Sequence, residues 1–105
     1  MNAHLFAAPL YEKAVADGVP SAGTAVLAAL LHSVPRELTS TEFRVVSPTK
    51  LARRPHSTRG TARTGLRLLE GSPYVHVRRV TGAKKKNWTF EVQLLTDAEA
   101  LAVVR

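Results

Sequence analysis

The N-terminal third of the chain carries apolar residues at the three- and four-residue spacing of a helix. A first short helix is predicted over residues 10–17, with Pro9 at its first position and a glycine at its end. A second, more apolar helix is predicted over residues 21–34, where Ser21 can cap it and a following proline stops it. We interpret residues 1–20 as an N-terminal extension in front of a domain that begins with the second helix.

A short strand and a short helix follow a polar connection. Residues 43–46 are β-prone and are enough for one short strand. Ser47 and the proline after it provide a helix cap and a first helical residue, which predicts a helix of about two turns over residues 48–54. Leu51 and Ala52 are the residues of this helix that we expect to face a core.

The segment over residues 57–71 is strongly amphipathic when it is wound as a helix. Either Ser57 or Thr58 can cap it, and Gly71 closes it. Its apolar side consists of Ala62, Gly65, Leu66 and Leu69. Its opposite side presents Gly60, Arg63, Thr64 and Arg67, with Arg59 at the shoulder. Because glycine costs about 1 kcal/mol relative to alanine in a helix, Gly65 indicates either close packing on the helix before it or a looser helix.

Beyond residue 71 the apolar period changes from 3.6 to 2, which is typical of strands. In the first run, Val75 and Val77 alternate with Tyr74, His76 and Arg78. In the second run, polar residues alternate with Trp88, Phe90, Val92 and Leu94. Turn-forming residues and three lysines separate the two runs. The pattern predicts an antiparallel hairpin with a basic tip, in which Trp88 forms the outer end of the apolar face.

The last ten residues, 96–105, read as a short C-terminal helix. Thr96 and Glu99 have the spacing of a capping box, in which each side chain hydrogen-bonds the other residue's backbone amide. Leu101 and Val104 are its apolar residues. Either this helix or the one over residues 10–17 could form the interface of a homodimer, and the pattern does not choose between them.

The distribution of charge along the chain indicates more about a binding partner than the overall composition does. The chain has 105 residues, about one domain, and a net charge of +7. Residues 43–86 hold twelve basic side chains against one acidic side chain, whereas residues 1–42 and 87–105 each have a net charge of −2. A basic block with almost no compensating acid favours a polyanionic partner.

Several kinds of chemistry find no support in the sequence. The chain has no cysteine, and its four histidines are scattered without a metal-ligand spacing, so neither a disulfide nor a metal site is expected. Gly60 and Gly65 lack the Lys-Ser/Thr pair that a phosphate-binding loop requires. No nucleophile–base pair, secretory leader or membrane-spanning run is evident. We therefore expect a cytoplasmic protein that is not an enzyme and has no cofactor, membrane contact or small-molecule ligand.

The predicted order of helix, short strand, helix, tight turn, helix and hairpin resembles the winged helix-turn-helix superfamily of DNA-binding domains. The resemblance is carried by residues 43–46, 47–52, 57–70 and 73–75, and it covers residues 21–95. It implies an α+β winged helix fold: a three-helix helix-turn-helix core with a short strand and a C-terminal β-hairpin wing. Extra short helices would flank this domain at residues 1–20 and 96–105. Members of the superfamily are often dimeric regulators.

The resemblance also implies different DNA contacts for different residues of the basic block. The second helix of the motif enters the major groove, so the expected base-reading residues are Arg59, Gly60, Arg63 and Thr64. Arg63 is the first candidate, because arginine can pair bidentately with guanine. The expected phosphate-binding residues are Lys50, Arg53, Arg54, Thr58 and Arg67. The wing would contact DNA through Lys84, Lys85 and Lys86.

The sequence therefore favours a protein that binds double-stranded DNA with some sequence preference. It would act as a small transcriptional regulator or as an accessory factor in replication, partition or transfer. Two alternatives stay open: binding of RNA or of nucleic acid regardless of sequence, and a protein-interaction winged helix module that docks an acidic partner. Aromatic residues make up only 6% of the chain and are absent from the basic helices, which argues against a base-stacking platform.

Overall fold

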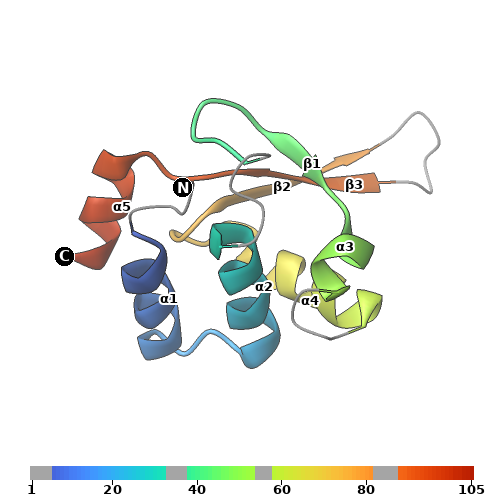
Figure 1. Cartoon of the computed structure of the whole chain (residues 1–105), viewed down its shortest axis with the longest axis horizontal. Coiled ribbons are helices and arrows are strands. Elements are labelled where there is room, and N and C mark those ends of the chain that lie inside the picture. The colour runs from blue at the N-terminus through green and yellow to red at the C-terminus, as the bar shows by residue number, and fades with distance from the viewer. Residues whose placement is uncertain (1–5, 33–37, 54–57, 82–87) are drawn as a thin grey trace.

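The computed structural model describes residues 6–32, 38–53, 58–81 and 88–105. Within these ranges the chain is an α+β structure with five helices and one three-stranded antiparallel sheet. The helices are α1 (Ala7–Ala16), α2 (Ser21–His32), α3 (Pro48–Arg53), α4 (Arg59–Leu69) and α5 (Asp97–Val104). The strands are β1 (Arg44–Val46), β2 (His76–Thr81) and β3 (Trp88–Gln93). Helices α1 to α4 lie on one side of the sheet, and α5 lies beyond one end of it (Figure 1).

The sheet has the order β1-β3-β2, so that β3 is the central strand. The predicted hairpin is confirmed, since β2 pairs antiparallel with β3 and places Val77 opposite Val92. On its other side β3 pairs with β1, where Phe90 lies opposite Val46. Phe90 and Val92 are buried, as the period-2 pattern predicts. The pairing joins two strands that are more than forty residues apart in the sequence, and the β1 segment alone gave no sign of its partner.

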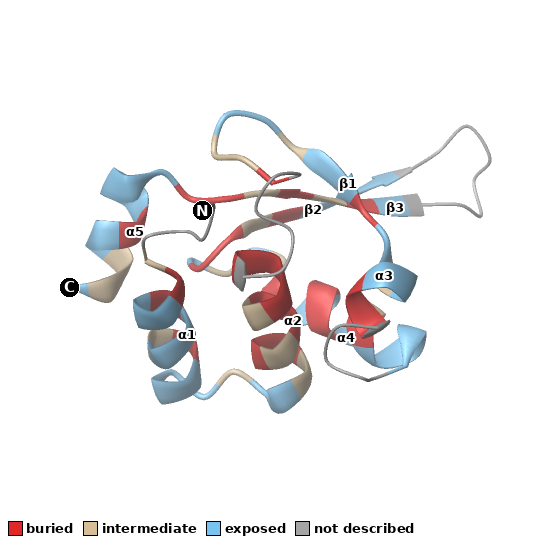
Figure 2. Ribbon diagram, viewed as in Figure 1, coloured by how far each residue is buried: buried red, intermediate tan, exposed pale blue. Residues whose placement is uncertain are grey.

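The core lies between the sheet and the helix faces that are turned toward it (Figure 2). Helix α4 buries the four residues predicted for its apolar side: Ala62, Gly65, Leu66 and Leu69. A Cβ atom at Gly65 would overlap the carbonyl oxygen of Ala22 and the side chain of Val26, both on α2. The expected close packing at Gly65 is therefore confirmed, but its partner is α2 and not the preceding helix α3.

The two terminal helices belong to the same core. Leu10 and Ala14 of α1 are fully buried, and α1 packs on α2 and α5. The capping box at Thr96 and Glu99 is present at the start of α5. The prediction that Leu101 lies on the buried side of α5 is wrong, because Leu101 is 42% exposed. The fully buried residue of this helix is Ala100.

Several element boundaries differ from the predicted ones by one to three residues. Helix α1 begins at Ala7, so Pro9 lies in its first turn, where the missing N–H would have had no partner within the helix. Ser21 lies inside α2 and does not cap it, because the carbonyl of Pro20 accepts the first helical hydrogen bonds, from the Gly23 and Thr24 amides. The predicted end of this helix at Val34 lies outside the described residues.

The strand boundaries also shift by one or two residues. Strand β1 begins at Arg44, and the ring of Phe43 is instead covered by the guanidinium group of Arg78, 3.8 Å from its centroid. Strand β2 begins at His76, and both Tyr74 and Val75 are buried before it, so the alternation does not extend to them.

A hydrogen bond of Tyr74 links the segment before β2 to Asp17 at the end of α1. The Tyr74 side chain is buried, and its hydroxyl donates a short hydrogen bond to the Asp17 carboxylate. Burial and this hydrogen bond raise the pKa of the Tyr74 hydroxyl to about 12. The same hydrogen bond holds the pKa of Asp17 below its usual range. Both shifts favour the state in which a neutral tyrosine donates to a carboxylate.

The Tyr74 contact should give the protein an alkaline stability transition. The folded-state pKa is raised, so the contribution is fully present below the unfolded value of 10 and is lost as the pH rises to about 12. Over this window the free energy of unfolding should fall by about 2–3 kcal/mol more in the native sequence than in Tyr74→Phe. Urea denaturation of both proteins at several pH values measures the difference. Parallel pH profiles for the two proteins would contradict the assignment.

Candidate nucleic-acid interface

Helix α3 presents Lys50 to solvent because its other side is fixed in the core. The Lys50 amide donates to the Ser47 side-chain oxygen at 3.4 Å, and the Leu51 amide donates to the Ser47 carbonyl at 3.0 Å. This confirms Ser47 as the cap. Leu51 and Ala52 are buried, as predicted, so the side chain of Lys50 lies on the exposed face.

Helix α4 begins at Arg59, and Thr58 caps it. The Thr58 hydroxyl accepts from the Thr61 amide at 3.1 Å and forms a second hydrogen bond with the Thr61 hydroxyl at 3.0 Å. Ser57, the other candidate cap, lies outside the described residues. The exposed Thr58 side chain therefore has a structural role besides the phosphate contact that the resemblance implies.

The outer face of α4 carries the expected base-reading residues. Of these, Arg59, Gly60 and Thr64 are exposed, whereas Arg63 is partly buried. Arg67, an expected phosphate contact, is exposed as well. A Cβ atom at Gly60 would meet only the Thr58 hydroxyl, at 3.8 Å, so this position is open to solvent. Helix α4 thus combines a core-facing side with a polar face that includes three arginines, as the amphipathic pattern predicted.

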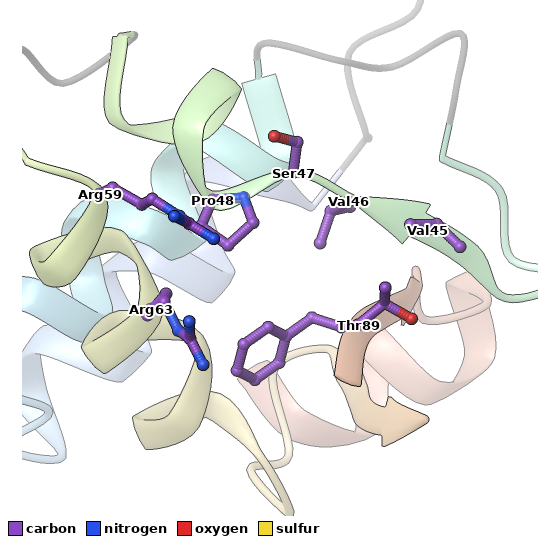
Figure 3. Close-up of a pocket in the computed structure, with 8 residues that line it drawn as sticks. Val45, Val46, Ser47, Pro48, Arg59, Arg63 and Thr89 are labelled. Atoms are coloured by element: carbon purple, nitrogen blue, oxygen red, sulfur yellow. The ribbon is translucent and has the colours of Figure 1, made fainter. Parts of the chain in front are cut away.

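Arg59 and Arg63 are among the residues that line an open hollow of about 250 Å³ between α4, the start of α3 and the sheet. We call this the arginine hollow; its lining residues are Val45, Val46, Ser47, Pro48, Arg59, Arg63, Thr89 and Phe90. In Figure 3 the Arg59 side chain reaches toward Pro48, whereas the Arg63 side chain points away from Arg59 and Pro48. No local pattern of residues indicates this hollow, because it exists only where β1 pairs with β3 beside α4.

The arginines of the sheet region are paired with carboxylates. Arg78 lies 2.7 Å from Glu91, and Arg79 lies 2.9 Å from Glu70. Arg44 pairs with Glu42. Glu42 and Glu91 lie just outside the basic block in the sequence, so the charge count for residues 43–86 overstates the positive charge on this side of the fold. Such exposed pairs add little stability, but they neutralise the surface locally.

The cations of α3 and α4 are placed differently. The side chains of Lys50, Arg59 and Arg67 form no ion pair with any residue in the described ranges. Together with Arg63 they make a patch that we call the α3–α4 basic surface. Among the described residues of the basic block, the cations without an ion pair therefore lie on the two consecutive helices α3 and α4.

Some of the expected contact residues lie outside what the structure describes. These are the side chain of Arg53, the whole of Arg54, and Lys84, Lys85 and Lys86 between β2 and β3. The expected position of Trp88 at the outer end of the core also concerns a side chain that is not described. In the described ranges, no helix is both long enough and apolar enough to cross a membrane.

Comparisons of this chain with protein-family models, with curated proteins and with solved structures find no match.

Proposed function

We propose that this chain is a winged helix-turn-helix protein that binds double-stranded DNA with some sequence preference. The observation that carries the proposal is the contrast in charge between the two sides of the fold. The arginines of the sheet are paired with carboxylates, while Lys50, Arg59 and Arg67 are exposed on α3 and α4 without an ion pair in the described part of the chain. Such a surface suits a polyanion.

The order of the elements supports the same proposal. Helix α2, strand β1, helices α3 and α4, and the β2–β3 hairpin follow one another as in a winged helix, with β1 completing the sheet beside β3. The two helices α3 and α4 pack on each other, as the helices of a helix-turn-helix motif do. In the proposed complex the β2–β3 hairpin is the wing, and its lysine-rich connection would reach DNA beside the major groove.

Helix α4 has the dimensions of a recognition helix. An α-helix with its side chains is about 10–12 Å across, which matches the major-groove width of about 12 Å, and the 11 residues of α4 give a face about 16 Å long. Lys50 on α3 would then hold a phosphate, since the first helix of the motif crosses the DNA backbone. We propose a cytoplasmic role as a transcriptional regulator or as an accessory factor in replication, partition or transfer, exerted by occupying a DNA site.

The proposal is tested by titrating labelled duplexes with the whole chain at several salt concentrations. With about 6–8 phosphate contacts, log affinity should fall against log salt with a slope of about −5 to −7. A random single-stranded RNA serves as competitor and should displace the duplex poorly. Absence of duplex binding at low salt would contradict the proposal. Stronger binding of the RNA would support the RNA alternative instead.

A further inference from the structure

Helix α5 is held to the rest of the fold by one side. Ala100 is fully buried where α5 packs on α1. The Glu99 carboxylate accepts a hydrogen bond from the Thr96 amide at 3.0 Å and lies 3.1 Å from the His76 side chain on β2. These consecutive residues fix the side of α5 that is turned toward the fold. The opposite side of the helix is therefore exposed (Figure 2).

The exposed side of α5 has an apolar centre with opposite charges at its two ends. Leu101, which is 42% exposed, lies midway between Asp97 at the first helical position and Arg105 at the C-cap. Residues four apart in a helix share one stripe of its surface. Asp97 and Arg105 form no ion pair with another residue in the part of the chain that the structure describes. We call Asp97, Leu101 and Arg105 the α5 stripe.

The α5 stripe is complementary to a second copy of itself. When two α5 helices cross antiparallel, Leu101 packs on the partner's Leu101, and Asp97 meets the partner's Arg105 at both ends. A parallel arrangement would instead place like charges against each other. Two identical surfaces that fit through a two-fold axis form an isologous interface, the usual kind in symmetric dimers. The order of charge, leucine and opposite charge therefore selects a second copy of this chain as the occupant.

The location of α5 also suits a contact between two copies. Figure 1 shows α5 and α3 at opposite ends of the molecule, so pairing through α5 leaves the α3–α4 basic surface of each copy uncovered. Residues 1–42 and 87–105, which contain α1 and α5, each have a net charge of −2 in a chain of net charge +7. Two copies therefore repel each other less at this end than at the basic surface.

Helix α1 offers a weaker case for the same role. It exposes Tyr11 and Val15, which are apolar enough for an interface. Its one basic side chain, Lys13, is however already paired with Asp17 at 3.2 Å. An apolar face without free complementary charges does not select its own copy. The structure thus distinguishes between the two helices that the sequence left as alternatives.

We propose that two copies of this chain associate through antiparallel α5 helices, with Leu101 on the two-fold axis. This inference goes beyond the proposed function, and its tests use no DNA, so its failure would leave duplex binding to be judged by its own titration. The eight residues of α5 span about 12 Å, and a pair of such helices buries less than the roughly 1,200–2,000 Å² of stable interfaces. The dimer should therefore be weak, with a dissociation constant of about 0.1 mM.

The first test is sedimentation equilibrium of the whole chain from about 10 μM to about 1 mM, a range that brackets the expected dissociation constant. The native chain should change from monomer to dimer. Leu101→Asp should remain monomeric, because it places two carboxylates on the axis. Val15→Asp is the matched control on α1 and should associate like the native chain. A native chain that stays monomeric throughout, or equal losses in the two variants, would overturn the proposal.

Exchanging the charges tests the antiparallel direction. Asp97→Lys and Arg105→Glu should each weaken association about tenfold, because each variant by itself brings like charges together at both ends. An equimolar mixture of the two variants should recover the native affinity, since the facing charges are then opposite. Thermal melting verifies that both variants are folded. A mixture that associates no better than its components would overturn the antiparallel pairing.

Introduced cysteines give a second measurement that does not depend on affinity. The chain has no cysteine of its own, so each variant carries a single thiol. A disulfide requires Cα atoms about 4.4–6.8 Å apart. Under mild oxidation Leu101→Cys should form a covalent dimer, and Asp97→Cys should form one only when it is mixed with Arg105→Cys. Efficient cross-linking of Asp97→Cys to itself, or none of Leu101→Cys, would overturn the proposal.

Discussion

Gly65→Ala should lower the free energy of unfolding by about 2–3 kcal/mol, although alanine is the better helix former. Helix propensity alone would favour the substitution by about 1 kcal/mol. The added Cβ atom, however, would overlap the carbonyl oxygen of Ala22 and the side chain of Val26. The Val26 side chain is itself buried, and a backbone carbonyl in a helix cannot turn aside, so α2 and α4 must move apart. Denaturation by urea or heat measures the loss.

Gly60→Ala is the matched control on the same helix. Gly60 is exposed, and its added Cβ atom would meet only the Thr58 hydroxyl at 3.8 Å. Helix propensity should therefore dominate and raise the free energy of unfolding by about 0.5 kcal/mol. If both substitutions stabilised the protein, the close approach of α4 to α2 at Gly65 would be wrong.

Removing three cations from the α3–α4 basic surface should weaken duplex binding by about 10²–10³-fold. The variant Lys50→Gln/Arg59→Gln/Arg67→Gln removes exposed side chains that form no ion pair in the described residues. A charge that neutralises a phosphate contributes about 0.9 to the salt slope, or close to tenfold in affinity at about 0.1 M salt. Fluorescence anisotropy at several salt concentrations measures both quantities, and the slope should become shallower by about 2 to 3.

The structure supplies a control with the same change in net charge. The variant Arg44→Gln/Arg78→Gln/Arg79→Gln also removes three positive charges, but each of these arginines is paired with a carboxylate. It should lose much less affinity for duplex DNA than the first variant. Equal losses in the two variants would mean that binding follows net charge alone, and the α3–α4 basic surface would then not be the interface.

The sequence by itself determined the order of the elements and most of their inward faces. These features follow from short-range interactions: the apolar period along each helix or strand, and caps such as those at Ser47, Thr58 and Thr96. Each signal lies within a few residues of the bond or contact that it predicts. The buried side of α4 and the buried Phe90 and Val92 of β3 were predictable for this reason.

Boundaries were less predictable, because neighbouring residues compete for the same role. Ser21 has a capping side chain, yet the carbonyl of Pro20 accepts the first helical hydrogen bonds of α2. In α5 the choice between Ala100 and Leu101 as the buried residue depends on how the helix packs on α1, which its own period does not specify.

Only the tertiary structure decided which charges are available and where they point. Arg78 and Arg79 belong to the same basic block as Arg59 and Arg67, but the fold brings Glu91 to Arg78 and Glu70 to Arg79. The pairing of β1 with β3 creates the arginine hollow, and the contact of Gly65 with α2 sets the position of α4. These contacts join segments that are far apart in the chain, so they depend on packing and strand register, which no local pattern of residues encodes.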